Sequence, residues 1–222
     1  PGWGESLFVK QVWPEAKLKL YCEFFYHAQG ADVGFDPEFS SPDPTDSARV
    51  VLKNANTLLQ FQLADAGLSP THWQASTFPD HIKKRITVIH DGIDTENLTP
   101  DPAACFVLDD GRTLTSRDEV ITFVSRALEP YRGFHIFMRS LSKILASSPN
   151  TCVVIVGKEG VSYGAEPLDG ISWKTRFTEE SKAHLSIQQL ARIHFVGTIE
   201  YSRLISLLRV SRVHVYLTYP FV

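Results

Sequence analysis

The chain has 222 residues, enough for one large domain or two modest ones. Its hydrophobic share of 43% and charged share of 21% are ordinary for a globular protein. A formal net charge of −3 tells against a nucleic-acid-binding protein, because such proteins normally present a basic face. No apolar run in the sequence approaches the ~20 residues that a transmembrane helix needs.

The three cysteines, Cys22, Cys105 and Cys152, lie far apart in the sequence. Their odd number and wide spacing tell against a disulfide framework and against a zinc site. We therefore expect all three to be reduced, buried thiols of a protein from a reducing compartment.

The two ends of the chain lack the features expected of a complete protein. The first residue is Pro1 and not methionine, and the last residues follow directly after a strand-like run. We therefore expect an internal piece of a longer protein, in which the lack of a signal peptide says nothing about targeting.

The first third of the chain predicts a strand, a long loop and a helix. Residues 17–25 form a largely apolar run typical of a strand, and residues 27–46 are rich in Gly, Pro, Asp and Ser, which predicts a loop. Residues 47–64 follow helical spacing, and Gly67 is expected to end this helix. One mostly apolar face of the helix is expected to pack inward: Val51, Ala55, Leu58, Leu59 and Gln62.

Two further elements precede a change in composition. Thr71 can cap a second helix, and residues 86–89 predict a strand. Residues 100–118 are polar and contain prolines near their start, which favours an interdomain linker. We therefore place one domain in residues 1–99 and a second in residues 119–222, joined by this linker.

The second domain shows a regular alternation of strands and helices. The expected strands are residues 121–124, 152–156, 193–196 and 213–217, and the expected helices are residues 134–145 and 201–208. The run at 152–156 is apolar without alternation, as in strands of a parallel sheet that are buried on both faces. This order indicates a doubly wound α/β domain.

A strand-to-helix turn in this domain carries two arginines. Arg126 follows the strand at 121–124, and Arg132 and Gly133 stand where the next helix begins. Ligands of open α/β sheets bind outside the carboxyl ends of the strands, and the free N–H groups of a helix start suit phosphate. A charge-assisted hydrogen bond from arginine contributes ~1.5–3 kcal/mol, against ~0.3–1 kcal/mol from the helix end, so the arginines would dominate. Gly133 would let a ligand approach the backbone. Taken alone, the pattern leaves open that both arginines are ordinary surface residues.

Several blocks of sequence, in order, carry a resemblance to a known family. Residues 88–94 look like its strand, Asn-Gly turn and Asp before the linker, and residues 123–126 with Arg132 and Gly133 look like its Val-Gly-Arg followed by Lys-Gly. Residues 153–157 and 195–197 look like its next two donor-domain strands with their glycines. Together these blocks resemble the retaining, GT-B-fold glycosyltransferases of family 4, which use nucleotide sugars.

The resemblance implies an α/β protein with two Rossmann-like domains that face each other across a cleft, both incomplete in this chain. The acceptor would bind the N-terminal domain and the nucleotide sugar the C-terminal one. Arg126 and Arg132 would hold the donor diphosphate and stabilise its charge as the sugar–phosphate bond breaks. The donor-binding residues implied in this way are Ser125, Arg126, Arg132, Gly133, Gly157, Val196 and Gly197.

The resemblance also sets expectations about partners. It implies a role in carbohydrate biosynthesis, with a nucleotide-diphosphate sugar as donor substrate and no cofactor or essential metal. The acceptor would be a glycan, a lipid-linked compound or a small molecule, and nucleic acid is not expected. A cytoplasmic location is implied, and peripheral association with the inner face of the membrane would come through parts outside this chain.

The sequence departs from the family pattern in four places. Ser125 replaces a glycine, and Arg132 replaces a lysine, which keeps the charge but changes the hydrogen-bond geometry. Glu23 stands where many relatives carry a histidine that faces the acceptor and the sugar. We expect Glu23 to be a polar, catalytic group on the acceptor side, and a buried structural carboxylate is the rival interpretation. The family's paired acids near the donor sugar should begin about where the chain ends, yet residues 219–222 contain no acid.

Other interpretations stay open. A degenerate GT-B module kept for binding or assembly fits the departures, whereas a nucleotide-sugar 2-epimerase would need carboxylates and histidines that are not apparent. His90 and Asp94 could imitate metal ligands, but they flank a turn glycine and have no third partner. Residues 162–164 could contact the donor or form a plain surface turn.

Overall fold

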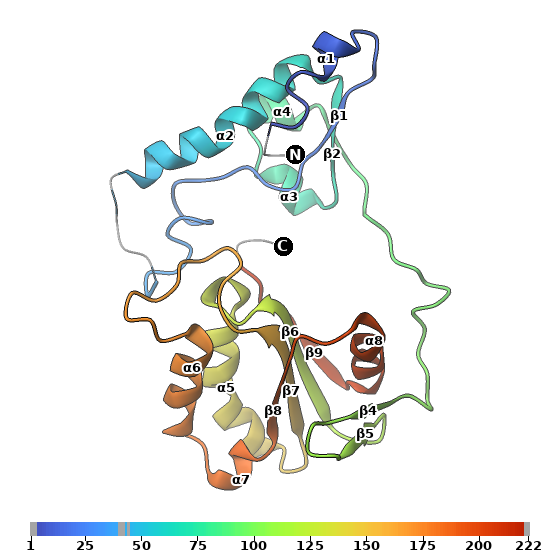
Figure 1. Cartoon of the computed structure of the whole chain (residues 1–222), viewed down its shortest axis with the longest axis vertical. Coiled ribbons are helices and arrows are strands. Elements are labelled where there is room, and N and C mark those ends of the chain that lie inside the picture. The colour runs from blue at the N-terminus through green and yellow to red at the C-terminus, as the bar shows by residue number, and fades with distance from the viewer. Residues whose placement is uncertain (1–3, 40–42, 44, 220–222) are drawn as a thin grey trace. The chain divides into compact units, whose positions relative to one another are not determined.

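A computed structural model describes residues 4–39, 43 and 45–219 of the chain. These residues form two compact α/β units, one ending at Ile93 and the other running from Asp94 to Tyr219 (Figure 1). The final residues 220–222, part of the acid-free end of the sequence, lie outside the described residues.

The first unit is built on a small parallel sheet. Its strands lie in the order β1 (Lys19–Tyr21), β2 (Ala66–Ser69) and β3 (Ile86–Val88), and both neighbouring pairs are parallel. Helix α1 (Val9–Val12) precedes β1, α2 (Asp46–Leu63) connects β1 to β2, and α3 (His72–Ser76) and α4 (Asp80–Lys83) connect β2 to β3. Thr71 caps α3 as predicted, because its side chain accepts a hydrogen bond of 3.1 Å from the N–H of Gln74.

Gly67 does not end the long helix. Helix α2 already ends at Leu63, and Gly67 lies in the middle of the unpredicted strand β2. A Cβ atom at position 67 would lie 2.9 Å from the Cys22 sulfur and 2.9 Å from a side-chain carbon of Ile86. Close packing between neighbouring strands therefore explains the glycine, and the prediction that it ends the helix is wrong.

The predicted helix is confirmed, but the prediction of its inward face is wrong. Val51, Leu58 and Leu59 are 67%, 39% and 48% exposed. The buried residues are instead Val50, Asn54, Gln60 and Phe61. Two amides lie on the buried side because the packing supplies hydrogen-bond partners for them, which a count of apolar residues does not register.

Asn54 joins α2 to the segment that follows β1. Its side chain accepts a hydrogen bond of 3.0 Å from the N–H of Tyr26 and donates one of 2.9 Å to the carbonyl of Tyr26. Replacing Asn54 with alanine is therefore expected to lower the free energy of unfolding of this unit by ~1–3 kcal/mol, since both backbone groups lose this partner. Chemical denaturation of Asn54→Ala tests this. Gln62→Ala, at an exposed position of the same helix, should stay within ~0.5 kcal/mol of the wild type, and an equal effect of the two changes would contradict the assignment.

The second unit is a doubly wound α/β domain, as predicted. Its parallel sheet has the strand order β8 (Ile193–Gly197), β7 (Cys152–Lys158), β6 (Val120–Ala127) and β9 (Val213–Val215). Helices α5 (Phe134–Ser147) and α6 (Trp173–Lys182) cover one face, and α8 (Tyr201–Val210) covers the other (Figure 1). A short helix, α7 (Ile187–Leu190), precedes β8, and a 3-10 turn, η1 (Pro130–Arg132), precedes α5.

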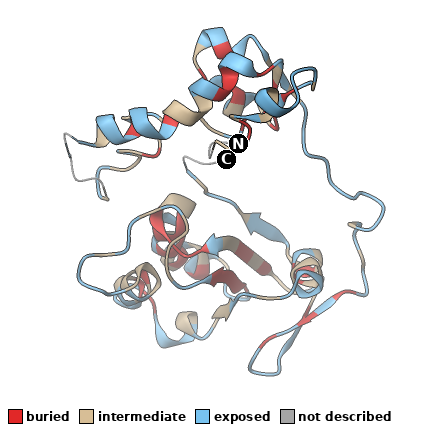
Figure 2. Cartoon of the chain, turned by 45° about the horizontal axis from the view of Figure 1, so that its top comes forward, coloured by how far each residue is buried: buried red, intermediate tan, exposed pale blue. Residues whose placement is uncertain are grey.

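The core of this unit lies on both faces of the sheet. Cys152, Val154 and Val156 of β7 belong to the cluster that contains Leu207 and Val210 of α8. On the α5 face, the ring of Phe123 stacks on that of Phe137 with centroids 4.8 Å apart. Because each face of β7 meets a helix layer, all six residues from Cys152 to Gly157 are buried, which confirms the interpretation of its unbroken apolar run (Figure 2).

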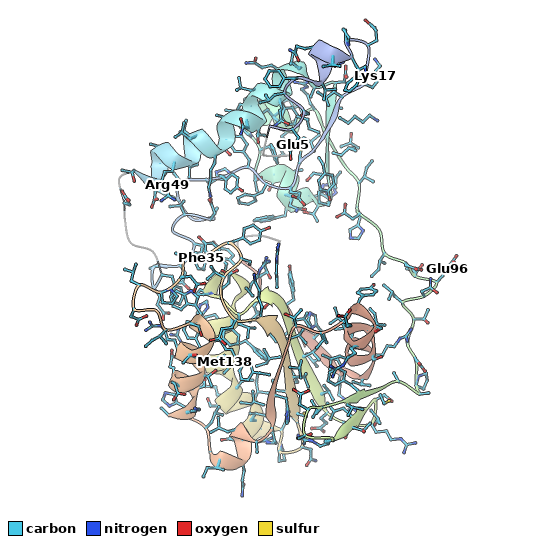
Figure 3. All side chains as sticks on the ribbon, viewed as in Figure 1. Glu5, Lys17, Phe35, Arg49, Glu96 and Met138 are labelled. Atoms are coloured by element: carbon cyan, nitrogen blue, oxygen red, sulfur yellow. The ribbon has the colours of Figure 1, made fainter. Side chains whose placement is uncertain are left out.

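Helix α5 also packs as its spacing predicts. Phe134, Phe137, Met138, Leu141 and Leu145 are at most 2% exposed. Met138 is labelled on this helix in Figure 3.

The segment predicted as a linker is part of the second unit. Residues 100–118 contain an antiparallel hairpin of β4 (Cys105–Val107) and β5 (Thr113–Thr115). Phe106 and Leu114 of this hairpin are each 2% exposed and belong to the α8-side core. The prolines and acids near residue 100 therefore lie in the turn that precedes a packed hairpin, and the boundary between the units falls at Ile93 and Asp94.

The three cysteines differ in environment. Cys22 and Cys152 are buried and Cys105 is exposed, so the prediction of a buried thiol is wrong for Cys105, and all three are free. Burial raises the pKa of the Cys22 thiol to about 11 and raises that of Cys152 as well. Among the helices of the described residues, none combines the length and apolarity needed to cross a bilayer.

Candidate functional site

The second unit contains a topological switch point. The chain runs outward from β6 to β7 and β8 and then returns to the other side of β6 to form β9. In sheets of this kind, ligands bind outside the carboxyl ends of the strands where the order reverses. The turn after β6 and the segment after β9 meet at that point, because the N–H of Tyr219 donates a hydrogen bond of 2.8 Å to the carbonyl of Tyr131.

Ser125 and Arg126 form an irregularity at the end of β6. The pairing runs from Val124 with Val156 to Ala127 with Lys158, so two residues of β6 face one residue of β7. The Ser125 hydroxyl donates a hydrogen bond of 2.8 Å to the carbonyl of Ala127. Bulges of this kind redirect a side chain, and here the redirected residue is Arg126, which is exposed.

Gly157 faces this bulge. A Cβ atom at position 157 would lie 2.8 Å from the Ser125 carbonyl oxygen and 2.8 Å from a side-chain carbon of Leu128. On the next strand, Gly197 pairs with Val156. Ser125, Arg126, Gly157, Val196 and Gly197 therefore lie along the same carboxyl edge of three adjacent strands.

Arg132 and Gly133 form the turn that leads into α5. Gly133 has φ +69°, in the left-handed region, and a Cβ atom there would lie 2.4 Å from the Leu217 Cβ and 2.5 Å from the Leu217 carbonyl oxygen. The space beside this glycine is thus occupied by the segment after β9. The sequence had suggested an approach by a ligand at this point, and that approach stays a prediction.

The guanidinium of Arg132 lies over an aromatic ring. Its central carbon is 5.1 Å from the centre of the Tyr163 ring, within the range of a cation–π contact. The Nε atom of Arg132 is buried and has no hydrogen-bond partner among the described residues. The loop at 162–164 is therefore more than a plain surface turn, since it orients one of the two predicted phosphate-binding arginines.

Glu129 is a site residue that the sequence did not reveal. It lies two residues after β6, is 0% exposed, and accepts hydrogen bonds from the main-chain N–H groups of Ser162 (3.1 Å), Tyr163 (3.3 Å) and Gly164 (2.9 Å). The Ser162 hydroxyl also donates to it. The available signal was an acid directly after an apolar run and before a proline, but that pattern is equally typical of an exposed turn.

Glu23 lies in the first unit, just after β1, and is exposed. This contradicts the rival interpretation of a buried structural carboxylate. In the same unit the Tyr21 hydroxyl donates a hydrogen bond of 2.5 Å to Asp91, which follows β3. That bond, some burial, and the negative charges of Asp91 and Glu23 raise the pKa of Tyr21 to about 12. Glu23 thus belongs to an acidic edge of the first sheet, and its catalytic role stays a prediction.

His90 and Asp94 make local turn contacts. The His90 Nδ1 accepts a hydrogen bond of 2.9 Å from the N–H of Gly92. Asp94 binds the side chain of Asn97 at 2.6 Å, and this bond contributes most to the lowering of its pKa. Across the part of the chain that the structure describes, no group of three His, Cys, Asp or Glu side chains could hold a metal ion.

Two histidines of the second sheet have lowered pKa values. Burial lowers the pKa of both His194 and His214, and the charge of Arg112 lowers that of His194 further. Asp110 and Asp109 oppose this shift at His194, and a hydrogen bond with Thr122 opposes it at His214. The Nε2 of His194 lies 2.6 Å from an Arg112 nitrogen, which can only donate, so His194 accepts as a neutral ring.

These shifts predict a pH dependence of stability. In the unfolded chain the histidines titrate near pH ~6.5. As the pH is lowered through that value, the unfolded chain binds more protons than the folded chain, so the free energy of unfolding decreases. The melting temperature is therefore expected to fall from pH 7.5 to pH 5.5, and the double variant His194→Gln/His214→Asn should show a shallower slope. Thermal melts across this range test the prediction, and equal slopes in the two proteins would contradict it.

A separate pocket of about 190 Å³ lies between α5 and α6. Its walls include Met138 and the ion pair of Arg139 with Glu180, whose atoms approach to 2.6 Å. None of the predicted donor residues lines it. This pocket is therefore distinct from the switch-point edge.

Comparison with known proteins bears on the family and the fold. Residues 1–98 match the model of the glycosyl transferase family 4 group. No curated protein matches the sequence significantly.

Three solved structures illustrate the similarity of fold. The N-terminal domain of trehalose-6-phosphate phosphatase from Candida albicans is 13% identical, with a TM-score of 0.61 over 96% of this chain and 47% of that chain. OtsA in its apo form is 11% identical, with a TM-score of 0.59 over 93% of this chain and 47% of that chain. The UDP-forming α,α-trehalose-phosphate synthase from Burkholderia xenovorans is 11% identical, with a TM-score of 0.53 over 95% and 49%.

At these identities the likeness shows the fold alone, which is that of GT-B glycosyltransferases with Rossmann-like domains. The expected fold class is confirmed. The chain spans about half the length of the solved structures that it matches, 47% to 49% for these three.

Proposed function

We propose that this chain transfers a sugar from a nucleoside-diphosphate sugar to an acceptor with retention of configuration, and the match of residues 1–98 to the glycosyl transferase family 4 group supports the proposal. The first unit would contribute to acceptor binding and the second to donor binding. Retention is part of the proposal through the family resemblance.

One observation carries the donor half of this proposal. Ser125, Arg126, Gly157, Val196 and Gly197 come from three separate stretches of sequence, and they line one carboxyl edge of a parallel sheet. The turn with Arg132 and Gly133 follows at the switch point of the same sheet. This is the edge at which doubly wound domains bind nucleotides.

The chemistry proposed for this edge is electrostatic. Breaking the bond between sugar and phosphate leaves negative charge on the diphosphate, and fixed guanidinium groups stabilise that charge more in the transition state than in the ground state. Arg126 is exposed on the bulge, and the guanidinium of Arg132 lies over the Tyr163 ring, a contact that uses none of its N–H donors. The Burkholderia synthase is described as UDP-forming, which supports a nucleoside diphosphate as the leaving group here.

Calorimetric titration of the full-length protein with UDP and with GDP tests the proposal. We expect micromolar-range affinity for one of them and its loss in Arg126→Ala. Arg117→Ala is the matched control, because Arg117 is also exposed but precedes β6 at the opposite end of the strand. No binding of either nucleotide by the wild-type protein would reject the proposal.

A binding module without catalytic activity is a second candidate. One observation favours it: a domain with the same fold, at a TM-score of 0.61, belongs to a protein named as a phosphatase. Donor hydrolysis or transfer distinguishes the candidates, since a binding module would bind nucleotide or acceptor without turnover. A 2-epimerase would instead change the sugar of the donor without any acceptor.

A further inference from the structure

The segment between β7 and α6, residues 159–172, follows the carboxyl end of β7 and is called here the crossover loop. It contains no helix or strand of its own. A loop of this kind needs specific contacts if it is to hold a side chain in one place, because its backbone lacks the regular hydrogen bonds of a helix or strand.

Glu129 provides those contacts. Its carboxylate accepts hydrogen bonds from three main-chain N–H groups and one hydroxyl group, all of residues 162–164 in the crossover loop. A fully buried carboxylate is strongly unfavourable unless it is hydrogen-bonded in this way, so the carboxylate and the loop depend on each other.

Gly164 brings the loop close enough for this contact. A Cβ atom at position 164 would lie 2.9 Å from a Glu129 carboxylate oxygen and 2.9 Å from a ring carbon of Tyr131. Only glycine permits this approach without displacement of the carboxylate.

The same loop reaches Arg132. Tyr163 donates its N–H to Glu129, and its ring lies beneath the Arg132 guanidinium at 5.1 Å. Glu129 and Arg132 are both on the turn after β6, so the contacts form a closed path from the turn to the loop and back to the turn.

We propose that Glu129 is a positioning residue for the donor diphosphate, acting through Tyr163 on Arg132. This inference rests on the proposed function, since it takes Arg132 as a phosphate ligand. Glu129 itself would not contact the donor, because its carboxylate is buried and accepts four hydrogen bonds from the crossover loop.

The experiment is a double-mutant cycle in the full-length protein. Affinities for UDP or GDP, whichever the wild type binds, and for the matching nucleoside are measured in Glu129→Gln, Tyr163→Leu, Arg132→Ala and the double variant Glu129→Gln/Arg132→Ala. We expect Glu129→Gln to weaken diphosphate binding roughly 3- to 10-fold, which is the change in affinity expected from the loss of one cation–π contact. Nucleoside binding should be unchanged.

The coupling decides between positioning and a general structural effect. If Glu129 acts through Arg132, adding Glu129→Gln to Arg132→Ala causes little further loss. Equal losses in the presence and absence of Arg132 would overturn the inference while leaving the proposed function intact.

Tyr163→Leu keeps the inference testable if Glu129→Gln does not fold. Tyr163 is 55% exposed, so its replacement should leave the fold intact and reproduce the loss of diphosphate affinity. Wild-type affinity in Tyr163→Leu would reject the path through the ring. A wild-type protein that binds neither diphosphate would remove the proposed function, and this inference with it.

Discussion

Replacing Arg126 with alanine is expected to lower the kcat/KM of sugar transfer by about 100- to 1000-fold, the usual effect of removing one preorganised group that stabilises developing negative charge. The bulge at Ser125 places Arg126 at the switch-point edge, so its charge lies where the diphosphate is proposed to bind. The melting temperature should change little, since Arg126 is exposed.

Initial-rate kinetics with the full-length protein measure this effect. Arg126→Lys should retain part of the activity, because it keeps the charge and loses the forked hydrogen-bond geometry. Arg117→Ala should be indistinguishable from the wild type. A kcat/KM of Arg126→Ala within twofold of the wild type would remove Arg126 from the proposed mechanism.

Replacing Gly133 with alanine is expected to give the largest loss of stability of any glycine change in the second unit. Two costs add at this position. The left-handed backbone, with φ +69°, costs an L-residue ~1–2 kcal/mol. The new Cβ would also meet Leu217 at 2.4 Å, and overpacking of this kind costs ~1–3 kcal/mol. The free energy of unfolding should therefore fall by ~2–5 kcal/mol.

Gly170→Ala separates the two costs. Gly170 has φ +73°, nearly the same backbone conformation, but a Cβ atom there would meet no described atom within 4 Å. Denaturant unfolding should show a loss of only ~1–2 kcal/mol for Gly170→Ala. Equal losses in the two variants would mean that the segment after β9 moves away at no cost.

Gly133→Ala also reports on function. If the segment that contains Leu217 shifts to relieve the contact, it shifts at the switch point, beside the turn that carries Arg132. Nucleotide affinity in this variant should fall together with stability.

The local pattern of the sequence determined most of the second unit. Strand β7 was predictable because it is buried on both faces, so every position demands an apolar residue and no alternation interrupts the run. Helix α5 was predictable because its apolar residues repeat at helical spacing and meet one sheet face. Arg126 and Arg132 could be proposed as site residues because the order of strand, turn and helix implies a carboxyl edge.

The first unit was less accessible to such patterns. Strand β2 has only four residues, and one of them is Gly67, a residue typical of a helix end, so the local pattern does not predict a strand there. The inward face of α2 was misjudged because buried amides replaced apolar residues there, and Val51 and Leu59 remained exposed. The sequence of the hairpin at 105–115 resembles that of a linker, because its short strands are separated by turn residues.

Only the tertiary structure decided the geometry of the switch-point edge. The Glu129 contacts join residues 33 to 35 positions apart, and Gly133 meets Leu217 after the chain has passed through three further strands. Local sequence preferences act over a few residues, whereas these contacts exist only once β6, β7 and β9 lie beside one another in the sheet. The sequence by itself could therefore indicate which residues carry charge near the edge, but the buried acid that positions their turn and loop emerges only from the packing.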